Sequence, residues 1–456
     1  MADVYEELPF PWDHQGEGVS LLTGGSSALW LDPRLGKTRI AGEALRLLEG
    51  LERVAQVVVV CPVNAKEVWA HWLRTMMPHW PAEKLQGLTP VYLAASTRAL
   101  IVNPDVLDAQ GRAGKGYQGW AGTVVQWMGE RPTVLVLDEC HKYASNPNSG
   151  EYKAVQRLAL CAERVWELTG TFYESSALDA HWQLRMLGPR YPFYWTKRET
   201  YGERFCERKW NGFRGYLKEG VRKDGTRYKY RSGGYDYSGL KDGAERELVH
   251  ALEGVVLRRR RDECLDVPDV RWLPVWVDHL DQQVSLRRDE MAALRSELVL
   301  IKAQRTIEFV QELRERPVIV YGHHRAFCRN VANHFRAPLI YGATGEQERV
   351  RVQAEFMEGR HPVLVANLAL DAIDLSMACD DVYGELDWSA TKLRQSSDRK
   401  INGMDKREKR SHVLLVSGSV EEEVWNRILL KGQAMERLDL AARALRELGL
   451  SLAELG

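Results

Sequence analysis

Long hydrophobic runs are missing from this sequence. Its longest aliphatic stretch is Val57–Val60, far short of the roughly 20 apolar residues that span a bilayer. Paired cysteines are missing too, because the seven cysteines are dispersed and none forms a CxxC pair; this argues against a zinc site or a disulfide framework. The first residues, Met1–Glu7, have neither the basic nor the apolar region of a secretory signal. We therefore expect a cytoplasmic protein with no membrane partner.

An excess of either charge is also absent. In 456 residues, 63 Lys and Arg balance 63 Asp and Glu, which excludes a uniformly basic nucleic-acid binder. Local excesses remain possible, and two occur. Residues 197–231 hold twelve basic and five acidic residues with aromatics between them, and residues 392–410 hold eight basic and three acidic ones. The length predicts two to three domains.

Two stretches resemble α/β cores, at about 10–180 and 275–420. Short apolar runs alternate with charged helical segments in both, which is typical of parallel strands covered on both faces. The predicted strands are 28–31, 57–60, 99–102 and 134–137 in the first core, and 318–321, 363–366 and 413–416 in the second. Between the cores, Asp224-Gly225 predicts a hairpin turn joining 220–223 to 226–230.

A phosphate-binding loop is indicated by Leu31-Asp32-Pro33-Arg34-Leu35-Gly36-Lys37-Thr38, which follows a predicted strand and precedes a helical run. Backbone N–H groups at that helix start would hold phosphates. Lys37 would neutralise the β- and γ-phosphates, and the Thr38 hydroxyl would bind Mg²⁺. The first glycine of the strict pattern is replaced by Leu31, so an ordinary strand-to-helix turn is the alternative.

A second motif lies 101 residues further along. Val134–Leu137 is an apolar run that ends in Asp138-Glu139-Cys140-His141. Asp138 would hold Mg²⁺ through water, and Glu139 would orient and deprotonate the attacking water. A strand capped by surface acids is the alternative. The order of the two motifs, each at a strand end, favours an ATPase.

Taken together, these motifs resemble the superfamily 2 helicase-like ATPases of the Swi/Snf type. Asp138–His141 is similar to the DExH box, and Leu168-Thr169-Gly170-Thr171 to the motif that couples hydrolysis to movement. Gln15 resembles the glutamine that reads adenine. Gln395-Ser396-Ser397-Asp398-Arg399 resembles the start of motif VI. Shorter matches, such as Leu265-Asp266-Val267-Pro268, are closest to the annealing-helicase branch, which remodels forked DNA.

The resemblance implies a set of site residues. The catalytic residues are Glu139, Lys37 and Arg399; the nucleotide-binding residues are Gln15, Gly36, Lys37, Thr38, Arg39, Asp138 and Gln395; the Mg²⁺-binding residues are Thr38 and Asp138; and the coupling residues are His141, Thr169 and Thr171. Two motifs depart from the family. Leu370 and Ala372 replace motif V glycines, and the second motif VI arginine falls on Asn402 unless the segment has lost a residue. We assign Arg399 to the γ-phosphate in a shifted register.

Nucleic-acid contacts are expected in two places. By resemblance, Asn64 and Lys66 follow the motif Ia segment and would touch phosphates. The basic-aromatic insertion would contribute Arg222, Lys223, Arg227 and Lys229, whose charge gives affinity without sequence information. Its aromatics would stack on bases or wedge strands apart. The alternative for the insertion is a small local core with solvated charges.

We therefore expect two RecA-like P-loop lobes with parallel sheets, at 1–190 and 271–456, and a mainly helical basic insertion and linker at 191–270. The expected activity is ATP- and Mg²⁺-dependent movement on, or remodelling of, duplex or forked DNA, in a minimal bacterial or phage protein. The alternatives are an RNA-directed helicase of the same superfamily and a nucleic-acid-binding scaffold with weak catalysis.

Overall fold

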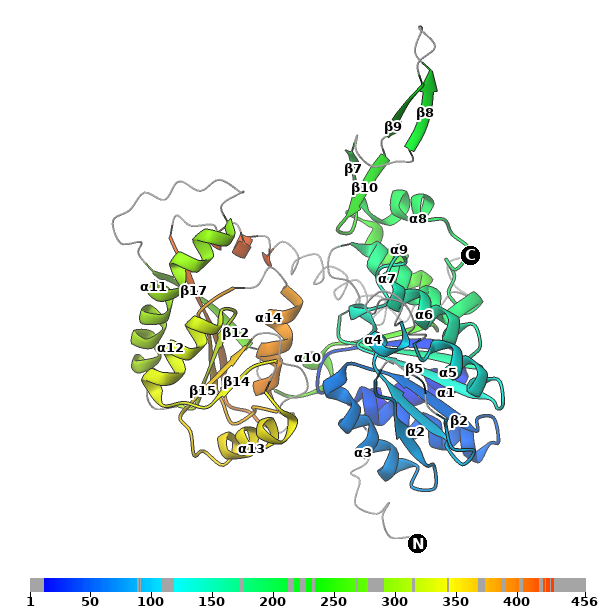
Figure 1. Cartoon of the computed structure of the whole chain (residues 1–456), viewed down its shortest axis with the longest axis horizontal. Coiled ribbons are helices and arrows are strands. Elements are labelled where there is room, and N and C mark those ends of the chain that lie inside the picture. The colour runs from blue at the N-terminus through cyan, green and yellow to red at the C-terminus, as the bar shows by residue number, and fades with distance from the viewer. Residues whose placement is uncertain are drawn as a thin grey trace. The chain divides into compact units, whose positions relative to one another are not determined.

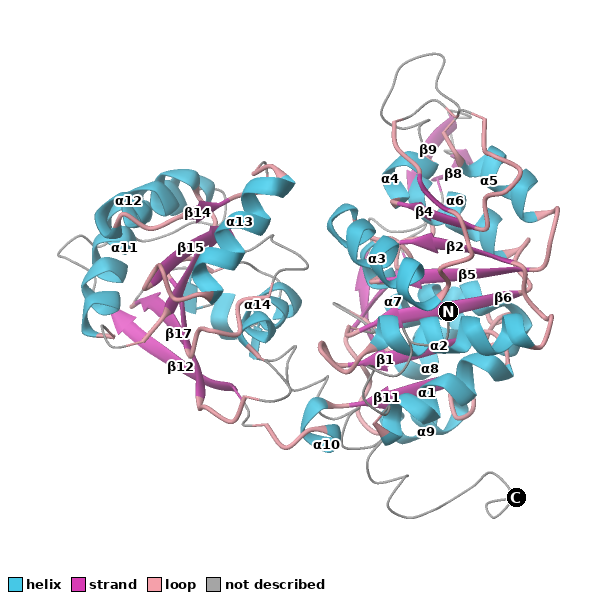
Figure 2. Cartoon of the chain, turned by 90° about the horizontal axis from the view of Figure 1, so that it is seen from below, coloured by secondary structure: helices cyan, strands magenta, loops and turns pink. Residues whose placement is uncertain are grey.

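The computed structural model of the chain describes residues 12–87, 90, 92–108, 119–171, 176–211, 217–221, 227–231, 234–267, 270–277, 291–313, 316–342, 344–367, 374–386, 390–401, 405–417, 421–422, 424–426 and 428–429. It forms two compact units. Among the described residues, the first unit comprises those up to Asp32 and from Gly36 to Arg259, and the second comprises Pro33–Leu35 and those from Arg260 onward. Figures 1 and 2 show that each unit contains its own β-sheet with helices packed on it.

The first unit is built on a seven-stranded sheet in the order β11-β1-β6-β5-β2-β4-β3. All neighbouring strands run parallel. The strands are β1 (Ser27–Leu31), β2 (Gln56–Val60), β3 (Ala82–Lys84), β4 (Ala99–Val102), β5 (Thr133–Asp138), β6 (Arg164–Thr169) and β11 (Val256–Arg259). The four predicted strands of this core are confirmed. Their side chains are buried along the whole strand, as expected for continuous apolar runs covered on both faces.

Two groups of helices cover this sheet. On one face α1 contacts α2, and α2 contacts α3; on the other, α4 and α5 contact α6, and α7 packs beside them. Their bounds are α1 (Asp13–Gly24), α2 (Lys37–Gly50), α3 (Lys66–Met76), α4 (Pro104–Leu107), α5 (Ala121–Met128), α6 (Gly150–Ala159) and α7 (Ala177–Leu184), with short 3₁₀ turns η1 (Val63–Ala65), η2 (Cys140–Lys142) and η3 (Arg185–Arg190). The sheet therefore lies between two layers of helices. The loops that connect strands to helices lie at the two edges where the strands end.

The insertion contains α8 (Arg198–Phe205), α9 (Ala244–Ala251) and four strands. β7 (Glu207–Asn211) pairs with β10 (Gly234–Ser238), and β8 (Leu217–Val221) pairs with β9 (Arg227–Arg231), both antiparallel. The antiparallel strand pairing of the predicted hairpin is confirmed, with Val221 opposite Arg227, whereas the predicted Asp224-Gly225 turn lies outside the described residues. In Figure 1 the β8–β9 ribbon continues beyond β7–β10. The insertion is less helical than expected, because aromatic and charged residues alternate in it with the two-residue period of strands.

Nor does the insertion form a unit of its own. Its residues up to Arg259 group with the first unit, and β11, which lies inside the predicted linker, completes the parallel sheet beside β1. The signal for β11 was weak because Val256-Leu257-Arg258-Arg259 is short and half charged.

The second unit has a six-stranded parallel sheet in the order β12-β17-β16-β13-β15-β14. Its strands are β12 (Val270–Val277), β13 (Val318–Gly322), β14 (Leu339–Ile340), β15 (Val363–Asn367), β16 (Asp380–Tyr383) and β17 (Lys409–Val416). The three predicted strands of this core are confirmed as β13, β15 and β17.

Helices also cover both faces of the second sheet. They are α11 (Met291–Glu312), α12 (Arg325–Phe335), α13 (Glu346–Met357) and α14 (Ala390–Ser397), which is followed by the 3₁₀ turn η5 (Asp398–Lys400). The short helix α10 (Arg261–Cys264) precedes β12 in the chain. One hydrophobic cluster joins α11 and α12 to the sheet, and another joins α13 and α14 to it. Among the described residues, no helix is long and apolar enough to cross a membrane.

Candidate functional site

The loop before α2 is shaped by Gly36. Its φ of 82° lies in the left-handed region, which glycine adopts without the steric cost of a Cβ. A Cβ at this position would also lie 2.4 Å from Nε2 of Gln15. Gly36 is therefore required both for the turn and for the close approach of the Gln15 side chain.

Lys37, the first residue of α2, turns back toward the strand before it. Its Nζ donates hydrogen bonds to the carbonyl oxygens of Leu31 (2.8 Å) and Asp32 (3.5 Å). Thr38 and Arg39 follow on the first turn of α2, and like Lys37 they are half-buried. The loop thus places an ammonium group, a hydroxyl group and a helix N-terminus at the carboxyl end of β1, where anions are stabilised.

Gln15 and Asp32 fix this loop from two sides. Gln15 is buried, and its Oε1 accepts a hydrogen bond from the backbone N–H of Trp12 at 3.2 Å. Asp32 is also buried and forms an ion pair with Arg258 of β11, at 2.9 Å between Oδ1 and Nη1. The sequence did not predict this particular pair, because Arg258 lies 226 residues from Asp32.

Asp138 and Glu139 lie at the end of β5, on the same edge of the sheet as Leu31, because all these strands run parallel. Asp138 Oδ2 accepts a hydrogen bond from Nε1 of Trp69 at 2.8 Å. Burial, and then the negative charge of Glu139, raise the pKa of Asp138 to about 6, while Lys37 and the Trp69 hydrogen bond oppose the rise. The influence of Lys37 on the Asp138 pKa indicates that the two predicted motifs share one electrostatic environment.

Glu139 adopts an unusual backbone conformation for a residue other than glycine, with φ at 50°. Such strain is retained where the surrounding structure holds it, and it is frequent at active sites. Here the Glu139 N–H donates to the carbonyl oxygen of Leu168 on β6 at 2.7 Å. Its carboxylate Oε2 is buried and accepts no hydrogen bond, with Nδ1 of His141 at 3.4 Å. The strained turn therefore carries a carboxylate oxygen, Oε2 of Glu139, that accepts no hydrogen bond.

The three predicted coupling residues are in contact. His141 Nδ1 lies 2.8 Å from the Thr169 hydroxyl, which donates to the Thr171 carbonyl (2.8 Å) and accepts from the Thr171 N–H (3.0 Å). Because the hydroxyl has a single hydrogen and gives it to Thr171, His141 must be the donor in its contact with Thr169. A continuous polar path therefore runs from Glu139 through His141 to the loop after β6.

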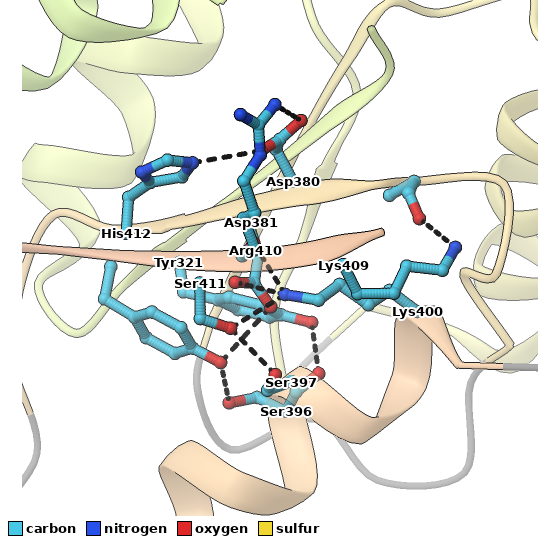
Figure 3. A network of polar contacts seen from close by, with 12 residues as sticks. Tyr321, Asp380, Asp381, Ser396, Ser397, Lys400, Lys409, Arg410, Ser411 and His412 are labelled. Carbon is cyan, nitrogen blue, oxygen red and sulfur yellow. Dashed lines mark hydrogen bonds and ion pairs between the residues drawn. The ribbon is translucent and has the colours of Figure 1, made fainter. Parts of the chain in front are cut away.

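In the second unit, Arg399 lies within η5 and is 7% exposed. Burial raises the pKa of the Tyr321 hydroxyl, and the Arg399 guanidinium beside it opposes the rise. The residues on either side of Arg399 form buried ion pairs: Asp398 with Arg261 (2.7 Å) and Lys400 with Asp381 (2.7 Å). Figure 3 shows Lys400 pointing into this polar network, together with Ser397 and Ser411. Gln395 is half-buried on α14.

Of the predicted nucleic-acid contacts, Asn64 is half-buried in η1. Lys66 needs a correction: it is buried, its Nζ donates to the Leu85 carbonyl at 2.8 Å, and burial lowers its pKa. It is therefore a structural residue rather than a surface phosphate contact. Arg222 and Lys223 lie outside the described residues, as do Leu370, Ala372 and Asn402 of the altered motifs. Arg227 and Lys229 lie on β9, opposite Val221 and Glu219.

No family model matches the chain. A curated Bos taurus protein, "SWI/SNF-related matrix-associated actin-dependent regulator of chromatin subfamily A-like protein 1", is 22% identical over 328 residues, which is 64% of this chain and 32% of that protein. The chain thus matches about a third of its relative's length.

Solved structures are similar over nearly the whole chain. The Sulfolobus solfataricus SWI2/SNF2 ATPase core in complex with dsDNA is 16% identical, with 96% of each chain covered and a TM-score of 0.43. S. cerevisiae Dbp5, solved as a variant bound to RNA and ADP BeF3, is 10% identical, with 95% of this chain and 94% of that chain covered and a TM-score of 0.54. The Dbp5 likeness concerns the fold alone.

The two parallel sheets, each with loops at its strand ends, have the fold of two RecA-like lobes, as in the Dbp5 structure. In sequence, the chain is similar, at 22% identity, to the SWI/SNF-related protein of Bos taurus.

Proposed function

We propose that the chain is an ATP-dependent DNA translocase or helicase that couples hydrolysis to movement on, or remodelling of, double-stranded or branched DNA. The observation that supports the proposal most strongly is that Lys37, Asp138 and Glu139 lie at the same edge of the first sheet. The SWI/SNF-related relative, which is by its name a regulator of chromatin, supports DNA as the partner. The proposed setting is the cytoplasm of a bacterium or of a phage-infected host.

ATP and Mg²⁺ fit the residues at this edge. Lys37 supplies positive charge beside the N-terminus of α2, and Thr38 and Asp138 supply oxygens of the kind that Mg²⁺ prefers. The buried Glu139 Oε2 accepts no hydrogen bond in the structure, so this oxygen can accept the proton of an attacking water. When bound, Mg²⁺ would neutralise phosphate charge. Gln15, held against Gly36, would bind the base.

We propose that Arg399 is the arginine that contacts the γ-phosphate. Lys400 is a poor candidate for that role, because it is fully buried and its ammonium is paired with Asp381. An arginine in this role raises the rate by about 10³–10⁵ in related NTPases. We therefore expect Arg399→Ala to lose most of the turnover while ATP binding is largely retained.

The test is ATP hydrolysis measured with Lys37→Ala and Glu139→Gln. Both should abolish turnover and leave the fold intact, since neither side chain belongs to a hydrophobic core. Lys153→Ala and Glu130→Gln are matched controls, because these residues are exposed in the same unit. A Glu139→Gln protein with wild-type turnover would refute the assignment.

The nucleic acid is identified by comparing stimulation of the ATPase by duplex DNA, forked DNA, single strands and RNA. Stimulation by duplex or forked DNA supports the proposal. Stimulation by RNA alone would favour the RNA-directed alternative. Salt-dependent DNA binding without stimulated turnover would favour the weakly catalytic scaffold.

A further inference from the structure

The two-stranded sheet of β7 and β10 has two unlike faces. Tyr235 lies directly opposite Trp210, and Tyr237 lies opposite Arg208. Side chains alternate between the faces of a strand, and directly opposed residues share a face. One face therefore carries Arg208, Trp210, Tyr235 and Tyr237, whereas the other carries Lys209, Asn211 and Asp236. All aromatic side chains of this strand pair are on the first face, which we name the aromatic face.

The aromatic face is anchored at one end. Tyr237 is buried, and it packs so closely on Gly202 of α8 that a Cβ there would lie 2.6 Å from the ring. The guanidinium carbon of Arg198 lies 4.9 Å from the centre of the same ring. The strand pair is thus fixed to the first unit through Tyr237, and this end of the face is closed.

The other end of the aromatic face is open. Trp210 is 58% exposed and Tyr235 is 37% exposed. Their rings meet edge to face, with centres 5.1 Å apart and planes at 75°. Edge-to-face contact covers little of the Trp210 ring. Arg208 places its guanidinium carbon 5.0 Å from the centre of the Tyr235 ring.

Cross-strand aromatic pairs also stabilise isolated strand pairs, but that role does not require the larger ring to be more than half exposed. An exposed indole next to a tyrosine ring that carries a guanidinium group is suited to an unpaired nucleic-acid strand. Every base has a face that can stack on an aromatic ring, and the flanking phosphates are attracted by positive charge. Charge complementarity supports this occupant, because residues 197–231 hold twelve basic and five acidic residues.

We propose that Trp210 and Tyr235 form a stacking platform for the bases of an unpaired DNA strand, with Arg208 beside it as a phosphate contact. The inference rests on the proposed function in one respect only, namely that the substrate is nucleic acid. It adds a binding site outside the ATPase motifs and predicts that the protein distinguishes forked or single-stranded DNA from blunt duplex.

The test is the affinity for single-stranded, forked and blunt duplex DNA in the absence of ATP, with Trp210→Ile and Trp210→Phe. Isoleucine suits a strand but has no aromatic face, whereas phenylalanine keeps one. We expect Trp210→Ile to weaken binding of single-stranded and forked DNA about 5- to 150-fold, the range for loss of one stacked base. Trp210→Phe should recover much of this loss, and blunt duplex binding should stay unchanged.

Trp276→Ile is the matched control, since Trp276 is a 51% exposed tryptophan on β12 of the second unit. It should bind all three DNAs like the wild type. Unchanged binding by Trp210→Ile, or an equal loss for blunt duplex, would overturn the platform. Because binding is measured without ATP, a failure of the proposed ATPase leaves this outcome readable.

Discussion

Lys400 and Asp381 form a 2.7 Å ion pair in which neither side chain is exposed to solvent. Burying two charges costs several kcal/mol each, unless hydrogen bonds satisfy the remaining donors and acceptors. Lys400 Nζ has two further acceptors, the Arg410 carbonyl (2.8 Å) and the Ser411 hydroxyl (2.7 Å). The pair therefore fastens η5, which carries Arg399, to β16 and β17.

We predict that Lys400→Met destabilises the protein by about 3–5 kcal/mol, because it leaves the Asp381 carboxylate buried without a countercharge. The double variant Lys400→Met with Asp381→Leu should recover most of that loss. Chemical denaturation of the two variants measures the difference. If the double variant were as unstable as the single one, the cost would come from packing rather than from the unpaired charge.

A second prediction concerns Thr169, whose hydroxyl joins His141 to Thr171. Thr169→Val removes these hydrogen bonds at nearly constant volume, whereas Thr169→Ser keeps the hydroxyl. If this path links hydrolysis to movement, Thr169→Val should reduce the stimulation of the ATPase by duplex DNA several-fold more than it reduces basal turnover. Thr169→Ser should behave like the wild type. Equal loss of basal and stimulated turnover in Thr169→Val would contradict the coupling role.

Continuous apolar runs predicted seven strands, because a parallel strand buried on both faces has no polar side. β16 escaped prediction since it begins with Asp380-Asp381, which resembles a surface turn. Both carboxylates are buried because partners distant in the sequence meet them: Lys400 for Asp381, and Arg410 with His412 for Asp380. Such compensation depends on tertiary packing and has no local signal.

The same reasoning applies to the candidate site. Lys37, Asp138 and Glu139 were predicted because their chemistry requires fixed spacings within short motifs. Trp69, which holds Asp138, lies 69 residues away from it, and only the packing of α3 against the sheet brings the two together. Lys66 was assigned to a phosphate contact by resemblance, but its ammonium reaches the buried carbonyl of Leu85, 19 residues away, and this contact has no local signal.

The third prediction follows from the raised pKa of Asp138. Burial and Glu139 raise that pKa to about 6 from an ordinary value of 3.8, so the folded state holds a proton there that the unfolded state has already lost. Asp138 therefore makes the protein less stable as pH rises from about 4 to about 6, and the penalty is constant above that range. Asp138→Asn should raise the Tm at pH 7 and have little effect near pH 4, while it abolishes Mg²⁺-dependent hydrolysis. A stability gain independent of pH would contradict the assignment.

Glu167 provides the last prediction. It lies on β6 between Leu137 and Ala28 of the adjacent strands and is completely buried, and neither carboxyl oxygen has a hydrogen-bond partner. Burial alone raises the pKa of Glu167 to about 8, so the group is largely a neutral acid at pH 7. By the same linkage, it lowers the free energy of unfolding continuously as pH rises from about 4.5 to about 8.

Glu167→Gln is neutral at every pH and nearly equal in shape. Its gain in free energy of unfolding over the wild type should therefore keep growing up to about pH 8, two pH units beyond the point where the gain of Asp138→Asn levels off. Denaturant titrations of both variants and the wild type between pH 5 and pH 9 measure the two profiles on the same scaffold. Coincident profiles would show that the two carboxyls do not titrate separately. A Glu167→Gln gain that is already complete at pH 6 would show that this carboxyl ionises in the folded state at lower pH, with a partner that offsets its burial.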